Sequence, residues 1–349
     1  MARAPFHING TEIPAGTRAT VDLPAAQLYT HTPLTIPVQV IHGRQAGPVL
    51  LVCAAIHGDE INGVEIIRRL VKQAGLRRLS GTLIAVPIVN VLGFIDRTRY
   101  LPDRRDLNRS FPGSESGSLA ARVAHLFKTA LLDKSTHVID LHTAAIHRAN
   151  LPQIRANLAD PVTRRMAEAF GVPLVINAGF IEGSLRHTAH ARGIPVITYE
   201  SGEALRFDEP GIRAGLKGVL RVMRDLAMLP PSRARRPAPR PQYAADSSTW
   251  LRAEQDGIFR ATVGLGARVK KGQALGWISD PFGEKEQPCE ASISGIVIGR
   301  NNLPLVHEGE ALFHIARFDE LSRAAEHVER WAEGLEADEP GPAAEPPIV

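Results

Sequence analysis

Short apolar runs alternate with amphipathic segments over the first two thirds of the chain. The run from Leu51 to Ile56 follows Gly47-Pro48 and leads through His57-Gly58-Asp59-Glu60 into a helical pattern over 63–70. Further apolar runs predict strands, and 3.6-residue periodicity predicts helices. The predicted strands are 18–23, 34–41, 83–89, 136–141, 173–178 and 194–199, and the further predicted helices are 119–132, 161–170 and 184–192. This alternation predicts an α/β fold with a mostly parallel or mixed sheet and helices on both faces.

Polar residues follow three of the predicted strands directly. His57, His142 and Glu200 each stand at a predicted strand end. The carboxyl ends of parallel strands share one edge of a sheet, so we expect these side chains to meet there. A His-x-x-Glu turn alone is usually just solvated. The pair of His57 and Glu60 would suit zinc, and a catalytic zinc site needs a third protein ligand and an open position for water.

Composition narrows the class of protein without defining it. The 349 residues are 44% hydrophobic and 22% charged, which predicts a soluble globular chain with one large and one smaller domain. The formal charge of +4 is too small and scattered to predict nucleic-acid binding. Two distant cysteines predict no disulfide and fit the cytoplasm. No signal peptide and no apolar run of roughly 20 residues is present, so we expect no membrane partner.

Four motifs in order resemble a known family. They are His57-Gly58-Asp59-Glu60, Asp106-Leu107-Asn108-Arg109-Ser110-Phe111-Pro112-Gly113, Asp140-Leu141-His142 and Glu200-Ser201-Gly202. Over about residues 40–225 the chain resembles the succinylglutamate desuccinylase and aspartoacylase family, a branch of the zinc carboxypeptidase fold. The resemblance implies one Zn²⁺ per chain, with His57, Glu60 and His142 as ligands.

The same resemblance implies the other roles at the site. It makes Glu200 the general base and acid, and Arg99 the group that polarises the scissile carbonyl. Asn108 and Arg109 would grip a substrate carboxylate, and Asp106 would orient the first zinc histidine.

Elementary chemistry agrees with these roles. Two imidazoles and a carboxylate leave zinc a position for water, which loses a proton near neutral pH. Glu200 can move that proton to the leaving amine. A guanidinium such as that of Arg99 stays charged beside the developing oxyanion, and Arg109 offers a fork for a carboxylate. We therefore expect a small carboxylated amide as substrate.

Several residues compete with these assignments. Glu203 lies close to Glu200 and is a second candidate for the base. Asp140 could be taken for a ligand because it lies two residues before His142, although a strand-end carboxylate or an outer partner of a ligand is the better interpretation. The other ambiguous residues are His187 and His190, read as a solvated helix face, Arg104 and Arg105, which either widen an anion site or are simply exposed, and Cys53, read as core packing.

The last third of the chain has a different pattern. Residues 1–229 form the predicted catalytic domain, and the Pro- and Arg-rich residues 230–244 predict an extended linker. In 245–317, Asp256-Gly257-Ile258-Phe259 recurs as Ser294-Gly295-Ile296-Val297, which predicts a pseudo-symmetric β-sandwich. It resembles lipoyl and biotinyl carrier domains, but Lys285 lacks the flanking residues of a carrier lysine, so a lid or an oligomer contact is preferred. Residues 318–349 predict a surface helix, with Trp331 on its apolar side, and a disordered acidic tail.

The sequence thus predicts a zinc-dependent amidohydrolase that removes the acyl group from an N-acyl amino acid or a similar small carboxylated amide. In the resembled family a C-terminal β domain partly covers the site, which favours small substrates. Two alternatives stay open. A metallocarboxypeptidase acting on short peptides or glutamyl tails would use the same residues, and a non-catalytic binding protein would keep only the fold.

Overall fold

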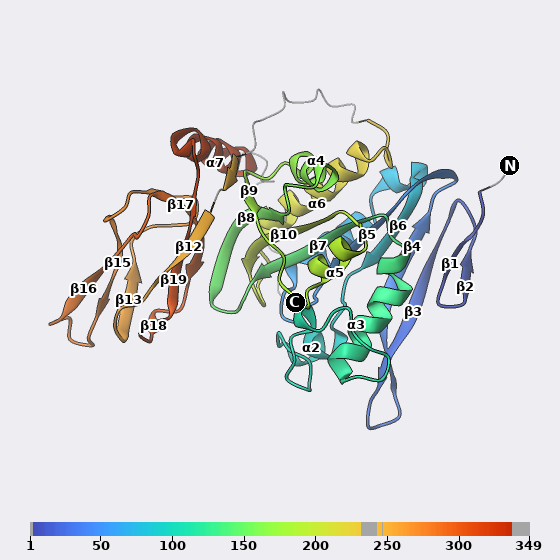
Figure 1. Cartoon of the computed structure of the whole chain (residues 1–349), viewed down its shortest axis with the longest axis horizontal. Helices are drawn as coiled ribbons and strands as arrows, with labels where there is room; N and C mark the ends of the chain where they lie inside the picture. Colours follow the sequence, from blue (N-terminus) through green and yellow to red (C-terminus); the bar gives the residue numbers. More distant parts are fainter. Residues whose placement is uncertain (1–2, 232–242, 246, 337–349) are drawn as a thin grey trace, which may run out of the picture.

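A large twisted sheet forms the centre of the molecule, with helices on both sides and a smaller β domain at one end (Figure 1). The computed structural model describes residues 3–231, 243–245 and 247–336. The helices are α1 (Asn62–Leu70), α2 (Val91–Asp96), α3 (Leu119–Ala130), α4 (Pro161–Phe170), α5 (Leu185–Ala191), α6 (Glu209–Asp225) and α7 (Leu321–Glu336), with short 3-10 turns η1 (Ala74–Arg78), η2 (Leu107–Arg109) and η3 (Leu132–Lys134).

The strands of the N-terminal part are β1 (Phe6–Ile8), β2 (Thr11–Ile13), β3 (Thr17–Gln27), β4 (Pro33–His42), β5 (Gln45–Ala54), β6 (Ser80–Val86), β7 (His137–Ala144), β8 (Arg148–Ala156), β9 (Leu174–Asn177) and β10 (Val196–Glu203). Those that follow are β11 (Tyr243–Ala245), β12 (Ser247–Arg252), β13 (Gly257–Ala261), β14 (Arg268–Val269), β15 (Ala274–Ser279), β16 (Glu286–Glu290), β17 (Gly295–Asn301), β18 (Leu305–Val306) and β19 (Ala311–Arg317).

The central sheet is mixed, as expected. Its main path runs β12-β19-β17-β8-β10-β7-β5-β6-β4-β3. Along this path, adjacent strands run parallel from β6 through β5 and β7 to β10. The pairs β3–β4, β4–β6 and β8–β10 are antiparallel. The carboxyl ends of β5, β7 and β10 therefore share one edge.

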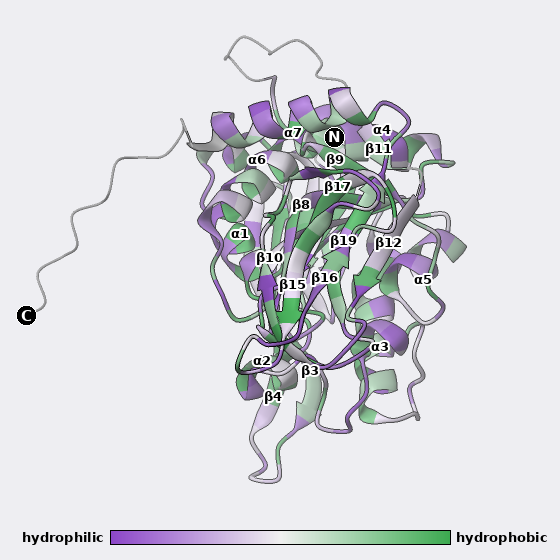
Figure 2. Ribbon diagram, turned by 90° about the vertical axis from the view of Figure 1, so that its left-hand side faces the viewer, coloured by the Kyte–Doolittle hydropathy of each residue, from purple (hydrophilic) through white to green (hydrophobic). Residues whose placement is uncertain are grey.

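Both faces of the sheet are buried, which explains the continuous apolar runs. Along β5, Leu50 and Val52 pack in the cluster that includes residues of α1, α4 and α6. Leu51 and Cys53 point to the opposite cluster, which includes residues of α3 and α5. Cys53 is a core residue, as expected. In Figure 2 the strands at the centre are largely hydrophobic, and the helices around them carry hydrophilic turns.

Two of the predicted strand ends are corrected by the structure. His142 and Glu200 lie within β7 and β10, which continue to Ala144 and Glu203, and they are direct partners across the two strands. The predictions stopped where the apolar runs became polar, yet backbone pairing continues because these polar side chains face the cleft. Strand β8 and helix α6 were not predicted.

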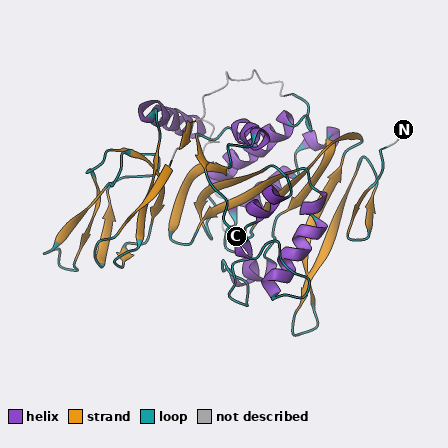
Figure 3. Ribbon diagram, viewed as in Figure 1, coloured by secondary structure: helices purple, strands orange, loops and turns teal. Residues whose placement is uncertain are grey.

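The C-terminal β domain is the sandwich that the internal repeat predicts (Figure 3). The repeated segments begin β13 and β17, which lie in different sheets. Each half lends a short strand to the other, because β14 pairs with β17 and β18 pairs with β13. One sheet is not separate, however. Strand β17 pairs with β8, so this half of the sandwich continues the central sheet.

The segments around this domain agree in part with expectation. The predicted surface helix is α7, and Trp331 packs half-buried against the core as expected. The expectation that residues 230–244 form no regular structure is wrong at their end, because β11 begins at Tyr243 and pairs with β9. Its backbone gains a parallel partner there, a long-range contact that a local pattern does not reveal. Residues 232–242 and the predicted acidic tail from 337 lie outside the described residues.

Candidate metal centre and catalytic cleft

The turn after β5 carries the first two candidate ligands. The Glu60 amide donates to the His57 carbonyl at 3.1 Å, which closes the turn before α1. Gly58 is needed here, because a Cβ at this position would lie 2.0 Å from the Gly93 carbonyl carbon. The close packing fixes the loop and places His57 Nδ1 2.7 Å from Glu60 Oε1.

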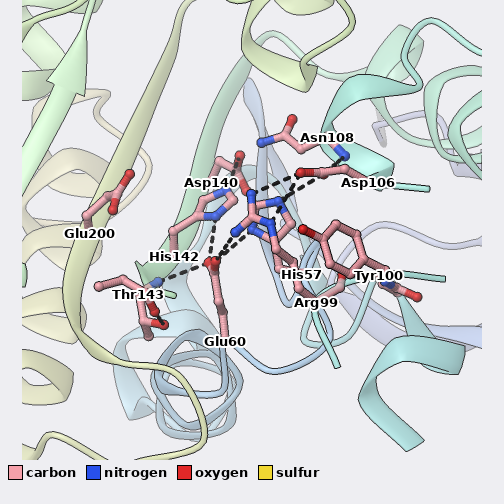
Figure 4. Close-up of polar contacts among 12 residues, drawn as sticks. His57, Glu60, Arg99, Tyr100, Asp106, Asn108, Asp140, His142, Thr143 and Glu200 are labelled. Carbon is pink, nitrogen blue, oxygen red and sulfur yellow. Dashed lines mark hydrogen bonds and ion pairs between the residues drawn. The ribbon is translucent and has the colours of Figure 1, made fainter. Parts of the chain in front are cut away.

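His142 on β7 completes the cluster (Figure 4). Its Nδ1 lies 2.7 Å from Glu60 Oε2, which also accepts a hydrogen bond from the Thr143 amide at 3.1 Å. One ligand atom from each of His57, Glu60 and His142 lies within 4.8 Å of the others, and all three residues are buried. Residues distant in sequence thus converge at the carboxyl edge of the sheet.

A carboxylate holds the outer nitrogen of each histidine. His57 Nε2 lies 3.1 Å from Asp106 Oδ1, and His142 Nε2 lies 2.8 Å from Asp140 Oδ2. Such partners fix the ring orientation and the tautomer of a ligating histidine. The contact of Asp106 is the one expected for it, and Asp140 contacts His142 from outside the cluster.

The electrostatics of the cluster suit a divalent cation. Burial lowers the pKa of His142, but the negative charges of Asp140 and Glu60 outweigh it and raise that pKa well above its usual value. Burial lowers the pKa of His57 as well, but the negative charge of Glu60 outweighs it and raises that pKa above its usual value. Burial would raise the pKa of Glu60, yet the two imidazoles hold it well below its usual range.

Both Nδ1 atoms thus lie against oxygens of the same Glu60 carboxylate. A divalent cation would balance the negative charge of that carboxylate, while each Nε2 keeps its own carboxylate partner. Two imidazoles and one carboxylate are a ligand set that suits zinc. The residues present thus fit the metal.

Arg99 packs directly against this cluster. Its Nη1 donates to Glu60 Oε1 at 3.2 Å, and its Nη2 donates to Asp106 Oδ2 at 3.0 Å. Burial lowers the pKa of Arg99, but the charges of Glu60 and Asp106 raise it above its usual value. The guanidinium is therefore a fixed positive charge beside the candidate ligands.

Asn108 and Arg109 sit on η2 at the entrance. The Asn108 Oδ1 accepts a hydrogen bond from the Leu185 amide at 2.9 Å, so this side chain joins η2 to the start of α5. Arg109 is exposed and donates to the Asn108 carbonyl at 2.7 Å. It has no carboxylate partner among the described residues. Both residues line the same cleft as His57.

Glu200 and Glu203 differ sharply in position. Glu200 lines the cleft, where its Oε2 accepts from Asn150 at 2.7 Å and its Oε1 lies 3.0 Å from Arg155 Nε. Figure 4 shows its carboxylate beside the cluster without a direct contact to it. Glu203 is not among the lining residues, and it accepts from the His147 amide and from the Asn302 side chain.

The cleft has a volume of about 460 Å³ and is rich in arginine. Lining residues that the sequence did not single out include Arg148, Asn150, Arg155, Arg186 and Trp250. The first three belong to the unpredicted strand β8, and Trp250 comes from β12 of the C-terminal domain. No local motif marks them, because tertiary pairing alone brings these strands to the cleft.

Other candidates lie outside the cleft. Arg104 and Arg105 are exposed and do not line it. His190 stacks on Phe180 with ring centroids 4.1 Å apart, and neither it nor His187 belongs to the metal cluster. Lys285 is exposed in the turn between β15 and β16.

Known proteins resemble this chain over most of its length. A family model for the succinylglutamate desuccinylase/aspartoacylase catalytic domain matches residues 46–226. The N-alpha-acetyl-L-2,4-diaminobutyric acid deacetylase of Halomonas elongata is 28% identical over 298 residues, which cover 80% of this chain and 85% of that protein.

Solved structures share the fold. The product-bound ectoine utilization protein EutE (DoeB) from Ruegeria pomeroyi has a TM-score of 0.77 at 24% identity, over 86% of this chain and 95% of that one. An aspartoacylase family protein from Mesorhizobium loti has a TM-score of 0.76 at 25% identity, over 90% of this chain and 99% of that one.

The mixed α/β fold and the buried His-Glu-His cluster define a hydrolase of the metal-dependent deacylase class. The chain belongs to the succinylglutamate desuccinylase/aspartoacylase family and is an amidohydrolase of that family. Among residues 3–231, 243–245 and 247–336, no helix is long and apolar enough to cross a membrane.

Proposed function

We propose that this enzyme uses one zinc ion, held by His57, Glu60 and His142, to remove the acyl group from a small N-acyl amino acid. The observation that carries the proposal is the buried cluster whose outer histidine nitrogens are fixed by Asp106 and Asp140. When bound, zinc would supply a Lewis acid and lower the pKa of water.

The chain's own residues would divide the remaining work. Glu200 is the proposed base, because it lines the cleft beside His142, and Asn150 and Arg155 hold both of its oxygens. Its carboxylate would take a proton from water and deliver it to the leaving nitrogen. Arg99 would stabilise the negative charge that develops on the scissile carbonyl oxygen.

The substrate carboxylate would bind at the entrance of the cleft. Arg109 is exposed there and has no carboxylate partner in the described part of the chain, so its guanidinium fork is available for a bidentate contact. Asn108 would contribute through its side-chain nitrogen Nδ2, since its side-chain oxygen Oδ1 already accepts a hydrogen bond from the Leu185 amide. Trp250 closes another side of the cleft, which favours small substrates over longer peptides.

The charged residues that line the cleft indicate which kind of N-acyl amino acid it prefers as substrate. Arg148 and Arg186 also lack carboxylate partners among the described residues. Arg148 instead lies over the Trp250 ring, and Arg186 donates to the carbonyls of Ala178 and Gly179. Of the lining carboxylates, Glu200 already pairs with Arg155. We infer that the cleft prefers an acidic N-acyl amino acid over one with a second amine, such as the substrate in the name of the Halomonas relative.

A substrate panel tests this function. Amine release should be measured with N-acetyl, N-formyl and N-succinyl amino acids, with N-alpha-acetyl-L-2,4-diaminobutyrate and with short dipeptides. Release from acyl amino acids, abolished by a chelator and restored by zinc, is the expected result. Cleavage of the dipeptides alone would make the enzyme a carboxypeptidase instead. The homo-oligomer that the sequence left open stays a prediction.

A further inference from the structure

A second cavity lies at the opposite edge of the sheet from the metal centre. Its volume is about 940 Å³, and its lining includes Gln45 at the start of β5 and Ser80 at the start of β6. Because β5 spans 10 residues at about 3.3 Å each, this end lies about 30 Å from the end that leads to His57. The two cavities have no lining residue in common.

Arginines from separate elements converge on this cavity, and none of its described lining residues is acidic. They are Arg18 on β3, Arg44 in the β4–β5 turn, Arg77 and Arg78 on η1, and Arg224 on α6. We call this the arginine cavity. Its floor is apolar, formed by the buried residues Ile41, Leu76, Leu79 and Leu229.

None of these arginines forms an ion pair with a described residue. Arg18 donates to the Val71 carbonyl at 3.2 Å and Arg224 to the Leu220 carbonyl at 3.3 Å, while the side chains of Arg77 and Arg78 have no hydrogen-bond partner among the described residues. Several other surface arginines are paired, for example Arg68 with Glu65, Arg165 with Asp225 and Arg192 with Asp133. The five arginines of this cavity instead share a site whose described lining residues include no carboxylate.

The turn next to the cavity makes room for one guanidinium. Gly16 has φ +82°, and a Cβ there would lie 2.7 Å from both Cγ and Nε of Arg44. The glycine amide also donates to the His42 carbonyl at 2.7 Å, which holds the turn against β4. The side chain of Arg44 thus lies across a backbone position where only glycine fits.

We propose that the arginine cavity binds a small organic polyanion that carries several phosphate or carboxylate groups. Guanidinium groups stay charged at every physiological pH, and each can form a bidentate contact with either kind of oxyanion. A bound polyanion would also relieve the repulsion among the unpaired cations. The volume suits a ligand of nucleotide size, and the apolar floor would contact its organic part. The ring of His42 is the one aromatic ring among the described residues that line the cavity, so charge rather than base stacking would set the affinity.

Calorimetric titration of the zinc-loaded enzyme tests this proposal. The probes are ATP and 1,2,3-propanetricarboxylate, which separate phosphate from carboxylate ligands, and zinc content is determined after each titration. The test variant is Arg77→Gln/Arg78→Gln. Its matched control is Lys270→Gln/Lys271→Gln, which removes the same charge from two adjacent exposed residues of the C-terminal domain. A further variant, Arg109→Gln, reports binding in the catalytic cleft.

We expect at least one probe to bind with 1:1 stoichiometry. Its affinity should fall roughly tenfold or more in the Arg77/Arg78 variant and stay unchanged in the Lys270/Lys271 and Arg109 variants. Thermal melting and amide hydrolysis should match the wild type, which would show that the variant folds. The proposal is overturned if neither probe binds at millimolar concentration, if the lysine control loses as much affinity, or if only Arg109→Gln weakens binding. None of these results depends on the proposed deacylase substrate.

Discussion

Replacing Asp140 by asparagine should weaken zinc binding without disturbing the fold. The Asp140 Oδ2 lies 2.8 Å from His142 Nε2, and the two side chains are only 2% and 6% exposed. An asparagine oxygen can still accept this hydrogen bond, so the variant removes mainly the negative charge that makes the imidazole a better ligand. Loss of such a partner typically costs 10- to 100-fold in metal affinity, which is about 1.4 to 2.8 kcal/mol.

The assay is a competition for zinc between the protein and a chromophoric chelator of known affinity. Asp133→Asn is the matched control, because Asp133 pairs with Lys128 and Arg192 rather than with a candidate ligand. Thermal melting of the metal-free proteins checks that both variants fold. An unchanged zinc affinity in Asp140→Asn, with a normal melting curve, would refute the role given to this residue.

Further predictions concern the base, the ligands and the entrance. Glu200→Gln should bind zinc normally but lose roughly 10²- to 10⁴-fold in kcat, whereas Glu203→Gln should stay active, as steady-state kinetics can measure. The reverse result would transfer the role to Glu203. Because the pKa values of His57 and His142 are raised in the metal-free protein, both rings must lose a proton to bind zinc. Zinc affinity should therefore fall as the pH falls, and a flat pH profile in the competition assay would count against this ligand set. Arg109→Gln should raise KM more than it lowers kcat for carboxylated substrates, and an equal effect on amidated substrates would argue against a carboxylate contact.

The sequence predicts those parts of the structure that local pattern determines. Leu50 to Ala54 are buried on both faces of the sheet, so their continuous apolar run is a direct signal of a central strand. His57 and Glu60 follow that signal immediately, and the order of the strands then brings His142 to the same edge. The turn before a helix and the strand that precedes it are both visible in the sequence.

The other half of the cleft could not be predicted in this way. Strand β8 combines Arg148, Asn150 and Arg155, which face the cleft, with too few consecutive apolar residues to indicate a buried strand. It forms because β10 and β17 pair with it on either side. Trp250 reaches the cleft only through the sheet that joins the two domains. These positions depend on contacts between distant segments, which no local pattern encodes.

X-ray absorption at the zinc edge of the zinc-loaded enzyme would identify the groups that hold the metal. We expect one zinc per chain, with two imidazole nitrogens and one carboxylate as its protein ligands, and loss of this signal in Glu60→Gln. A zinc ion with a different ligand set, or full zinc binding by Glu60→Gln, would contradict the assignment of His57, Glu60 and His142.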